Sequence, residues 1–139
     1  MAKKPRKITV DTNILISSFV FPSGVIREVL NHAIRHEIEI FVSTDILEEY
    51  AGVLSGKFGW SKDDITGNLD VVRRMMTIIK AEKNIKAVHT DPTDDKVLEC
   101  AVGSGSDTIV SGDRHLLDPG RFEGIRIIKA AGLLKEILK

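Results

Sequence analysis

Short apolar runs alternate with segments of helical period along the whole chain. The runs that predict strands cover residues 7–10, 38–42, 108–110 and 125–128. Between them, apolar residues recur every three or four positions, a spacing that indicates amphipathic helices. Strands separated by helices favour parallel pairing, because each helix returns the chain to the same end of the sheet. We therefore expect an α/β fold in which helices flank both faces of a parallel sheet.

The helical segments have recognisable start and stop signals. Pro22-Ser23-Gly24 precedes one of them, and the hydroxyl of Ser43 or Thr44 can cap another by accepting a backbone amide proton. Gly56 and Gly59 interrupt the pattern before it resumes at Ser61. A further short strand is expected over residues 85–88. The predicted helices cover residues 23–36, 43–54, 61–80, 94–102, 114–117 and 130–138.

Length and composition indicate a single domain, residues 1–139, that is large enough to bury its own core. With 42% hydrophobic and 29% charged residues, the chain has the composition of a soluble globular protein. No apolar run approaches the roughly 20 residues that span a bilayer. The single cysteine, Cys100, excludes an internal disulfide, so we expect a cytoplasmic protein with a buried thiol.

The formal net charge is zero, but the N-terminal segment 1–7 is basic because it contains Lys3, Lys4, Arg6 and Lys7. Such a tail is most simply a solvated terminus. Its alternative role is an arm that contacts nucleic-acid phosphates. Overall neutrality favours neither role.

Acidic residues stand where predicted strands end or helices begin. Asp11 follows residues 8–10, and Asp113 follows residues 109–112. Either residue alone is more simply a helix cap, since an aspartate there accepts amide protons from the next turn. Glu49 lies beside apolar positions of its helix, at the edge of the buried face. In the Asp94-Asp95 pair, Asp95 shares a face with core residues and Asp94 is the better cap, although the two can exchange roles.

These acids are more informative together than singly. The carboxyl ends of parallel strands form one edge of the sheet, and sites in such folds lie at that edge. Carboxylates that gather there repel one another unless a cation neutralises them. Oxygen ligands without thiolate or imidazole favour Mg²⁺ or Mn²⁺. The pattern therefore predicts metal-dependent hydrolysis of a phosphodiester, with coincidental capping as the alternative.

Four motifs together resemble the PIN-domain ribonucleases, in family order and over nearly the whole chain. Within that family the chain is most similar to the prokaryotic, VapC-like toxins of toxin–antitoxin pairs. Each motif alone is short, and the four together are specific. They are Val10-Asp11-Thr12-Asn13-Ile14-Leu15, Glu49-Tyr50 with Val53-Leu54, Asp91-Pro92-Thr93-Asp94-Asp95-Lys96-Val97-Leu98, and Asp107-Thr108-Ile109-Val110-Ser111-Gly112-Asp113 continuing to Leu117.

The resemblance implies a three-layer α/β/α domain with a central parallel sheet of about five strands. It implies that Mg²⁺ or Mn²⁺ is held by an acidic quartet, and that a metal-bound water cleaves RNA to leave a 5′-phosphate and a 3′-hydroxyl. It also implies a homodimer and an antitoxin protein as partner. The quartet matches Asp11, Glu49, Asp95 and Asp113.

The resemblance also suggests roles for residues near the quartet. Asn13 matches a neighbour that hydrogen-bonds the first carboxylate, and Ser111 matches a hydroxyl residue that lines the site. Asp107 opens its strand, so we expect it at the opposite edge of the sheet in a structural role. Candidates for contacts to RNA are Arg27, Arg114, His115 and the N-terminal lysines.

Other readings are weaker. The principal alternative is a non-catalytic PIN-like module that binds RNA or a protein partner. His32 and His36 have the spacing of zinc ligands on a helix, but no Glu follows His32, so a solvated helix face is the simpler interpretation. Phosphatases with an Asp nucleophile need a second Asp where this chain has Asn13, which cannot transfer a proton in that role.

Overall fold

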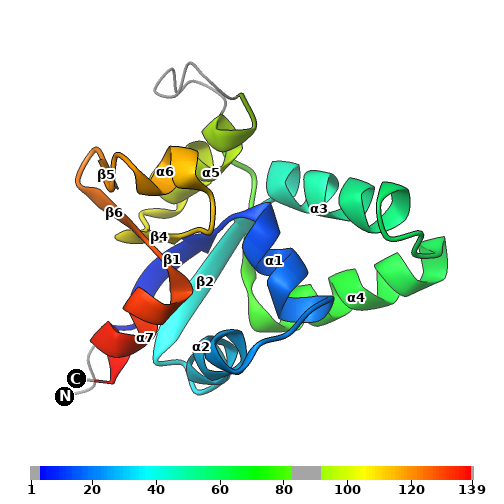
Figure 1. Ribbon diagram of the computed structural model, residues 1–139, viewed down its shortest axis with the longest axis horizontal. Helices are drawn as coiled ribbons and strands as arrows, with labels where there is room; N and C mark the ends of the chain where they lie inside the picture. The colour runs from blue at the N-terminus through cyan, green and yellow to red at the C-terminus, as the bar shows by residue number, and fades with distance from the viewer. Residues whose placement is uncertain (1–3, 83–91, 139) are drawn as a thin grey trace.

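A computed structural model describes residues 4–82 and 92–138, with side chains from residue 95 onward in the second range. Six strands form one sheet in the order β3-β2-β1-β4-β6-β5 (Figure 1). All neighbouring strands pair in parallel except β5 and β6, which are antiparallel. The strands are β1 (Arg6–Val10), β2 (Ile38–Ser43), β3 (Thr77–Ile79), β4 (Thr108–Val110), β5 (Arg121–Phe122) and β6 (Ile125–Ile128).

Helices cover both faces of this sheet and complete the predicted three-layer α/β/α architecture. Helix α5 packs against β1 and β2, whereas α2 packs against β2 and α7 (Figure 1). The helices α3 and α4 form an arm that extends beyond the sheet. The helices are α1 (Thr12–Phe19), α2 (Gly24–Ile34), α3 (Thr44–Gly56), α4 (Lys62–Met75), α5 (Pro92–Ser104), α6 (Arg114–Leu117) and α7 (Ala130–Ile137).

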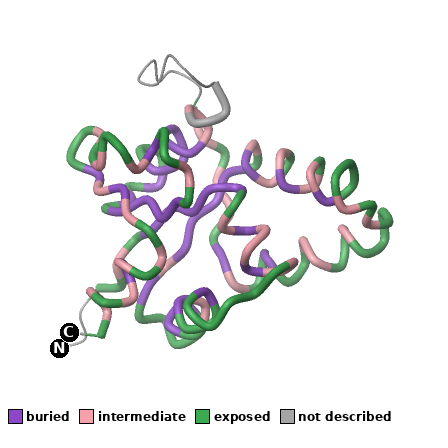
Figure 2. The backbone as a smooth tube through the Cα atoms, viewed as in Figure 1, coloured by how far each residue is buried: buried purple, intermediate pink, exposed green. Residues whose placement is uncertain are grey.

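The core lies between the central strands and the helices. Strands β1, β2 and β4 are almost entirely buried along their carboxyl halves (Figure 2). Leu15 of α1, Tyr50 of α3 and Leu98 of α5 are among the largest side chains that are fully buried. Cys100 is buried as expected, and this burial raises the pKa of its thiol to about 11.

Most helix starts follow the expected capping chemistry. The hydroxyls of Ser23, Ser43 and Ser61 accept the backbone N–H of the third residue that follows each of them. These bonds satisfy amide groups that lack a partner within the helix. Ser43, one of two candidate caps, is therefore the residue that caps α3.

Several elements differ from the sequence-based expectations. The helix predicted over residues 61–80 ends at Met75, and Thr77–Ile79 is the edge strand β3. Met76 is extended and starts a run in which Thr77, Ile78 and Ile79 are all β-branched, which favours a strand. The antiparallel strand β5 was not predicted. The N-terminal tail is shorter than seven residues, because β1 already begins at Arg6. The strand predicted over residues 85–88 lies outside the described residues.

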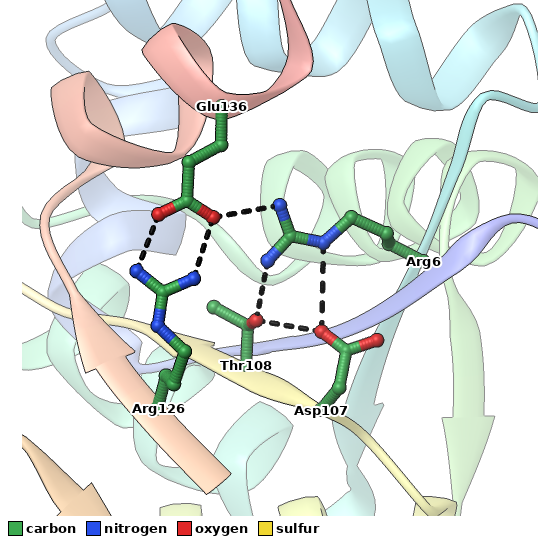
Figure 3. Close-up of polar contacts among 5 residues, drawn as sticks. All are labelled: Arg6, Asp107, Thr108, Arg126 and Glu136. Carbon is green, nitrogen blue, oxygen red and sulfur yellow. Dashed lines mark hydrogen bonds and ion pairs between the residues drawn. The ribbon is translucent and has the colours of Figure 1, made fainter.

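The amino ends of the strands are tied to the C-terminal helix. The Arg6 guanidinium donates to Glu136 Oε1 at 2.9 Å and to Thr108 Oγ1 at 2.7 Å (Figure 3). Arg126 pairs with both carboxylate oxygens of Glu136. Asp107 lies 3.6 Å from Arg6 Nε, so it stands at this edge in a structural role, as predicted.

No single helix within the described ranges is long and apolar enough to cross a membrane. The pair α1 and α2, bent by 98°, has the length and composition of a membrane span, but only when the two helices are taken together.

Candidate functional site

The site lies at the carboxyl ends of β1 and β4. Val10 and Val110 are paired in the parallel register, so Asp11 and Ser111 leave neighbouring strands side by side. The chain then turns into α1 after Asp11 and into α6 after Asp113. Helix α3 begins at the end of the adjacent strand β2 and runs past α1 (Figure 1). The topology thus gathers acids from three separate segments at one edge.

Asp11 is both a helix cap and a buried acid. Its Oδ1 accepts the Ile14 backbone N–H at 2.9 Å, and its Oδ2 accepts the Ser111 hydroxyl. Burial raises the pKa of this carboxyl, and the nearby Asp113 carboxylate raises it further. The hydrogen bonds from Ser111 and from the backbone oppose that shift. Asp11 is therefore held in position at an electrostatic cost, which a nearby cation would remove.

Ser111 links the first and last acids of the predicted quartet. Its hydroxyl donates to Asp11 and accepts the Asp113 backbone N–H at 2.9 Å. Asp113 in turn caps α6, since its Oδ1 accepts the His115 backbone N–H at 2.9 Å. Asp11 and Asp113 can thus cap helices and belong to the site at the same time. The side-chain hydrogen bond to Asp11 that was expected from Asn13 comes from Ser111.

Glu49 faces the same hollow from α3. Its Oε1 accepts the Thr12 hydroxyl, and the Lys96 ammonium lies 3.3 Å from its Oε2. The hollow has a volume of about 120 Å³ and lies between α1, α3, α5 and α6. Its lining residues are Asp11, Thr12, Asn13, Glu49, Val53, Val97 and Asp113.

Asp95 lies two residues before Val97, which lines the hollow. Its Oδ1 is inaccessible to solvent and has no hydrogen-bond partner. A buried carboxylate oxygen without a partner is costly, and a metal ion is one of the partners that removes the cost. Helix α5 begins at Pro92, so Asp94 stands inside the first turn and is not the N-cap, contrary to prediction. The side chain of Asp94 lies outside the described residues.

The donor set fits a hard divalent cation, although the acids do not converge on one point. Within residues 4–82 and 95–138, no three Asp, Glu, His or Cys side chains are close enough together to coordinate a single ion. The fit rests on the chemistry of the donors and on the partnerless Asp95 oxygen. Asp11, Glu49 and Asp113 line the hollow and are its candidate ligands, and Asp95, two residues before the lining residue Val97, is the fourth.

Two residues that contact Glu49 were not predicted from the sequence. Thr12 and Lys96 both bond to Glu49, yet neither has a signature of its own. Their positions next to predicted site acids could have indicated them, because Thr12 follows Asp11 and Lys96 follows Asp95. Of the predicted RNA contacts, Arg27, Arg114 and His115 are exposed.

Two other features lie away from the acids. His32 is buried and its Nδ1 is 2.7 Å from Glu37, whereas His36 is exposed beyond the end of α2, so the two histidines do not form a zinc pair. A larger hollow of about 590 Å³ opens at the amino ends of β2 and β3, beside Arg73 and Arg74. It contains none of the predicted site residues.

Comparison with known proteins identifies the family of the chain. The model of the PIN domain matches residues 7–115, which is most of the chain. The chain belongs to the PIN-domain family. Proteins of this family are typically nucleases, so a nuclease is the activity class that membership supports.

Two solved structures share the PIN fold at low sequence identity. One is VapBC2 from Rickettsia felis bound to a DNA fragment from its promoter, with a TM-score of 0.62 and 16% identity over 87% of this chain and 96% of that one. The other is PAE2754 from Pyrobaculum aerophilum, with a TM-score of 0.61 and 16% identity over 99% of this chain and 92% of that one. No curated protein matches the chain.

Proposed function

We propose that this PIN-domain protein is a divalent-metal-dependent endoribonuclease and the toxin of a toxin–antitoxin pair. The observation that carries the proposal is the placement of Asp11, Glu49 and Asp113 around one hollow at the carboxyl edge of the sheet. A purely structural role does not explain why a buried aspartate should keep a second carboxylate nearby, since their repulsion is destabilising.

The residues of the hollow have separable tasks. Asp11 and Asp113 present carboxylates whose positions are fixed by the Ser111 hydroxyl and by the helix caps. Glu49 is oriented by the Thr12 hydroxyl. When bound, Mg²⁺ or Mn²⁺ supplies a polarised phosphoryl oxygen and an acidified water for hydrolysis. These positioning bonds would reduce the rearrangement needed at the moment of reaction.

RNA cleavage tests the activity, with a matched pair of aspartate variants. Wild-type protein with Mn²⁺ should cleave a generic single-stranded RNA, and Asp11→Asn should reduce the rate by at least about a hundredfold, the scale of losing one electrostatic contribution at an active site. Asp107→Asn makes the same chemical change at the opposite edge and should cleave like the wild type. Equal cleavage by all three proteins would reveal a contaminating nuclease and refute the assignment.

Metal binding provides an independent measurement. A cation that binds the folded state must raise the melting temperature, by an amount set by its concentration relative to its Kd. Mn²⁺ should therefore stabilise the wild type and Asp107→Asn but not Asp11→Asn. No shift in the wild type with either Mn²⁺ or Mg²⁺ would favour a non-catalytic RNA-binding module.

The toxin role rests on the resemblance to VapC-like proteins and on a structural neighbour that is a VapBC complex. Induced expression of the wild type in a bacterial culture should arrest growth, and Asp11→Asn should not. Normal growth under expression of active, soluble enzyme would separate ribonuclease activity from a toxin role.

A further inference from the structure

Lys96 is a cationic side chain that contacts Glu49, one of the acids that line the hollow. Its ammonium lies 3.3 Å from Glu49 Oε2. The Lys96 side chain is 35% exposed and that of Glu49 27%, so this ion pair is partly withdrawn from water. Such a pair attracts more strongly than one on the open surface.

Both oxygens of Glu49 are therefore occupied. Thr12 donates to Oε1 from the first turn of α1, and Lys96 approaches Oε2 from α5. A divalent cation that binds Glu49 directly therefore competes with the Lys96 ammonium for the charge of the same carboxylate. Mg²⁺ binds carboxylate oxygens at about 2.0–2.1 Å, and Mn²⁺ takes similar oxygen ligands. A doubly charged ion at that distance interacts with the carboxylate more strongly than a single ammonium at 3.3 Å.

Lys96 is the partner best able to move. Its charge sits on a flexible four-carbon chain with three rotatable donors, and it remains hydrated while it changes partner. Thr12 is buried in the first turn of α1, and its short side chain has less freedom to leave Glu49. Lys96 also stands between Asp95 and Val97, so an ammonium released from Glu49 stays beside the hollow.

An acidic hollow also repels the phosphates of RNA. A lysine ammonium is a compact point charge that suits a phosphate oxygen. An ammonium beside the hollow therefore offsets part of the negative charge that a phosphate meets there.

We propose that Lys96 alternates between two partners: the Glu49 carboxylate before a divalent cation binds, and a phosphate of the RNA substrate afterwards. The inference rests on the proposed ribonuclease function and deepens it by assigning a substrate-binding residue. Lys96 then opposes metal binding in the absence of RNA and favours RNA binding once the metal is in place.

Titration with Mn²⁺ in the absence of RNA tests the first partner. Lys96→Met removes the competing charge, so its Kd for Mn²⁺ should be about two- to fivefold lower than that of the wild type, the effect of one partly exposed ion pair. In a Glu49→Gln background, the same replacement should leave the Kd unchanged, because the coupling requires the carboxylate. Lys135→Met on α7 removes an exposed charge and should have no effect.

The salt dependence of RNA cleavage tests the second partner. Each phosphate contact on a single strand contributes about 0.7 to the slope of log affinity against log salt concentration. Lys96→Met should raise KM about tenfold at low salt and lower this slope by about 0.7, with kcat changed less than KM. Lys96→Arg keeps the charge and should restore most of the affinity for RNA, whereas Lys135→Met should retain the wild-type slope.

The outcomes separate this inference from the function on which it rests. If the wild type binds Mn²⁺ and cleaves RNA, but Lys96→Met has the same Kd, KM and salt slope, the role of Lys96 is wrong and the ribonuclease stands. If Lys96→Met binds Mn²⁺ more weakly, Lys96 supports the metal site and the competition is refuted. If the wild type neither binds Mn²⁺ nor cleaves RNA, both proposals fail.

Discussion

Asp11 is the residue in which folding and site chemistry oppose each other most directly. Its carboxylate caps α1 and accepts the Ser111 hydroxyl, both of which favour the charged form. Burial outweighs these bonds and raises the pKa. For an acid whose folded pKa is raised, the folded state is favoured below the unfolded pKa, and that advantage is lost as the pH rises through the folded pKa.

We therefore expect Asp11→Asn to stabilise the folded chain near neutral pH. The amide oxygen can still accept the Ile14 N–H, while the buried charge and its repulsion by Asp113 are removed. Without divalent cations, the melting temperature at pH 7 should rise by a few degrees. The gain should vanish as the pH falls toward the ordinary aspartate pKa of 3.8. Thermal melts at pH 4 and pH 7 measure this, and an unchanged or lower melting temperature at pH 7 would show that the Ser111 bond dominates.

Sequence reasoning placed Asp11 and Asp113 at one edge because the ends of strands can be predicted from the local pattern, whereas Ser111 was suggested by the resemblance to the PIN-domain ribonucleases. It missed the contacts of Thr12 and Lys96 with Glu49, since these depend on how α1, α3 and α5 approach one another. Side-chain partners across separate helices have no local signature. Asp94 was assigned as a cap for a different reason: the helix was expected to begin at residue 94, whereas it begins at Pro92.

At the scale of the element, α3 and α4 are held together by a polar contact inside an apolar interface. The Tyr50 hydroxyl donates to Asn68 Oδ1 at 2.6 Å, and the Tyr50 ring is fully buried, with its centroid 6.5 Å from that of Phe19. Burial raises the pKa of Tyr50 to about 12, so the phenol remains a neutral donor well above neutral pH. Tyr50 immediately follows Glu49, and this bond therefore helps to fix the helix that carries a site acid.

Replacing Tyr50 with Phe should cost about 1 kcal/mol of unfolding free energy, because the Asn68 oxygen loses its donor while the ring packing is retained. Asn68→Ala should cost a similar amount, and the double variant little more than either alone. Denaturant melts give these values. The loss should be constant between pH 6 and pH 9, and the Mn²⁺ response should persist. Fully additive losses would show that the two side chains act independently.

The boundary between α4 and β3 was the largest error at this scale. Apolar residues continue at helical spacing through Met76 and Ile79, so periodicity alone extended the helix to residue 80. Pairing with β2 makes Thr77–Ile79 a strand, since Phe41, Val42 and Ser43 provide a parallel partner. Tertiary context here overrides a local pattern that fits both structures.

At the scale of the whole molecule, the two edges of the sheet have different roles. The carboxyl edge gathers acids that repel one another, whereas the amino edge joins residues separated by up to 130 positions through the Arg6–Glu136–Arg126 cluster (Figure 3). The pattern of a parallel sheet predicted which acids share the carboxyl edge. It did not predict the Arg6–Glu136 pair, because the position of α7 against β1 is set only when the chain is folded.

The cluster at the amino edge yields a prediction about global stability. Hydrogen bonds and charge from Arg126 and Arg6 lower the pKa of Glu136. For an acid whose folded pKa is depressed, the stabilisation is present above the unfolded pKa and is lost as the pH falls through the folded pKa. Glu136→Gln should therefore lower the melting temperature at pH 7, with a loss that shrinks below the ordinary glutamate pKa of 4.5.

The salt dependence of this loss identifies its origin. The side chains of Arg126 and Glu136 are 40% and 26% exposed, so ions reach the cluster and screen it. The difference in melting temperature between Glu136→Gln and the wild type should decrease from 0.05 M to about 1 M salt, where the Debye length falls to about 3 Å. Glu28→Gln, which removes an exposed charge from α2, should show no such difference. A loss that is independent of salt would assign the effect of Glu136 to packing of α7 and not to its ion pairs.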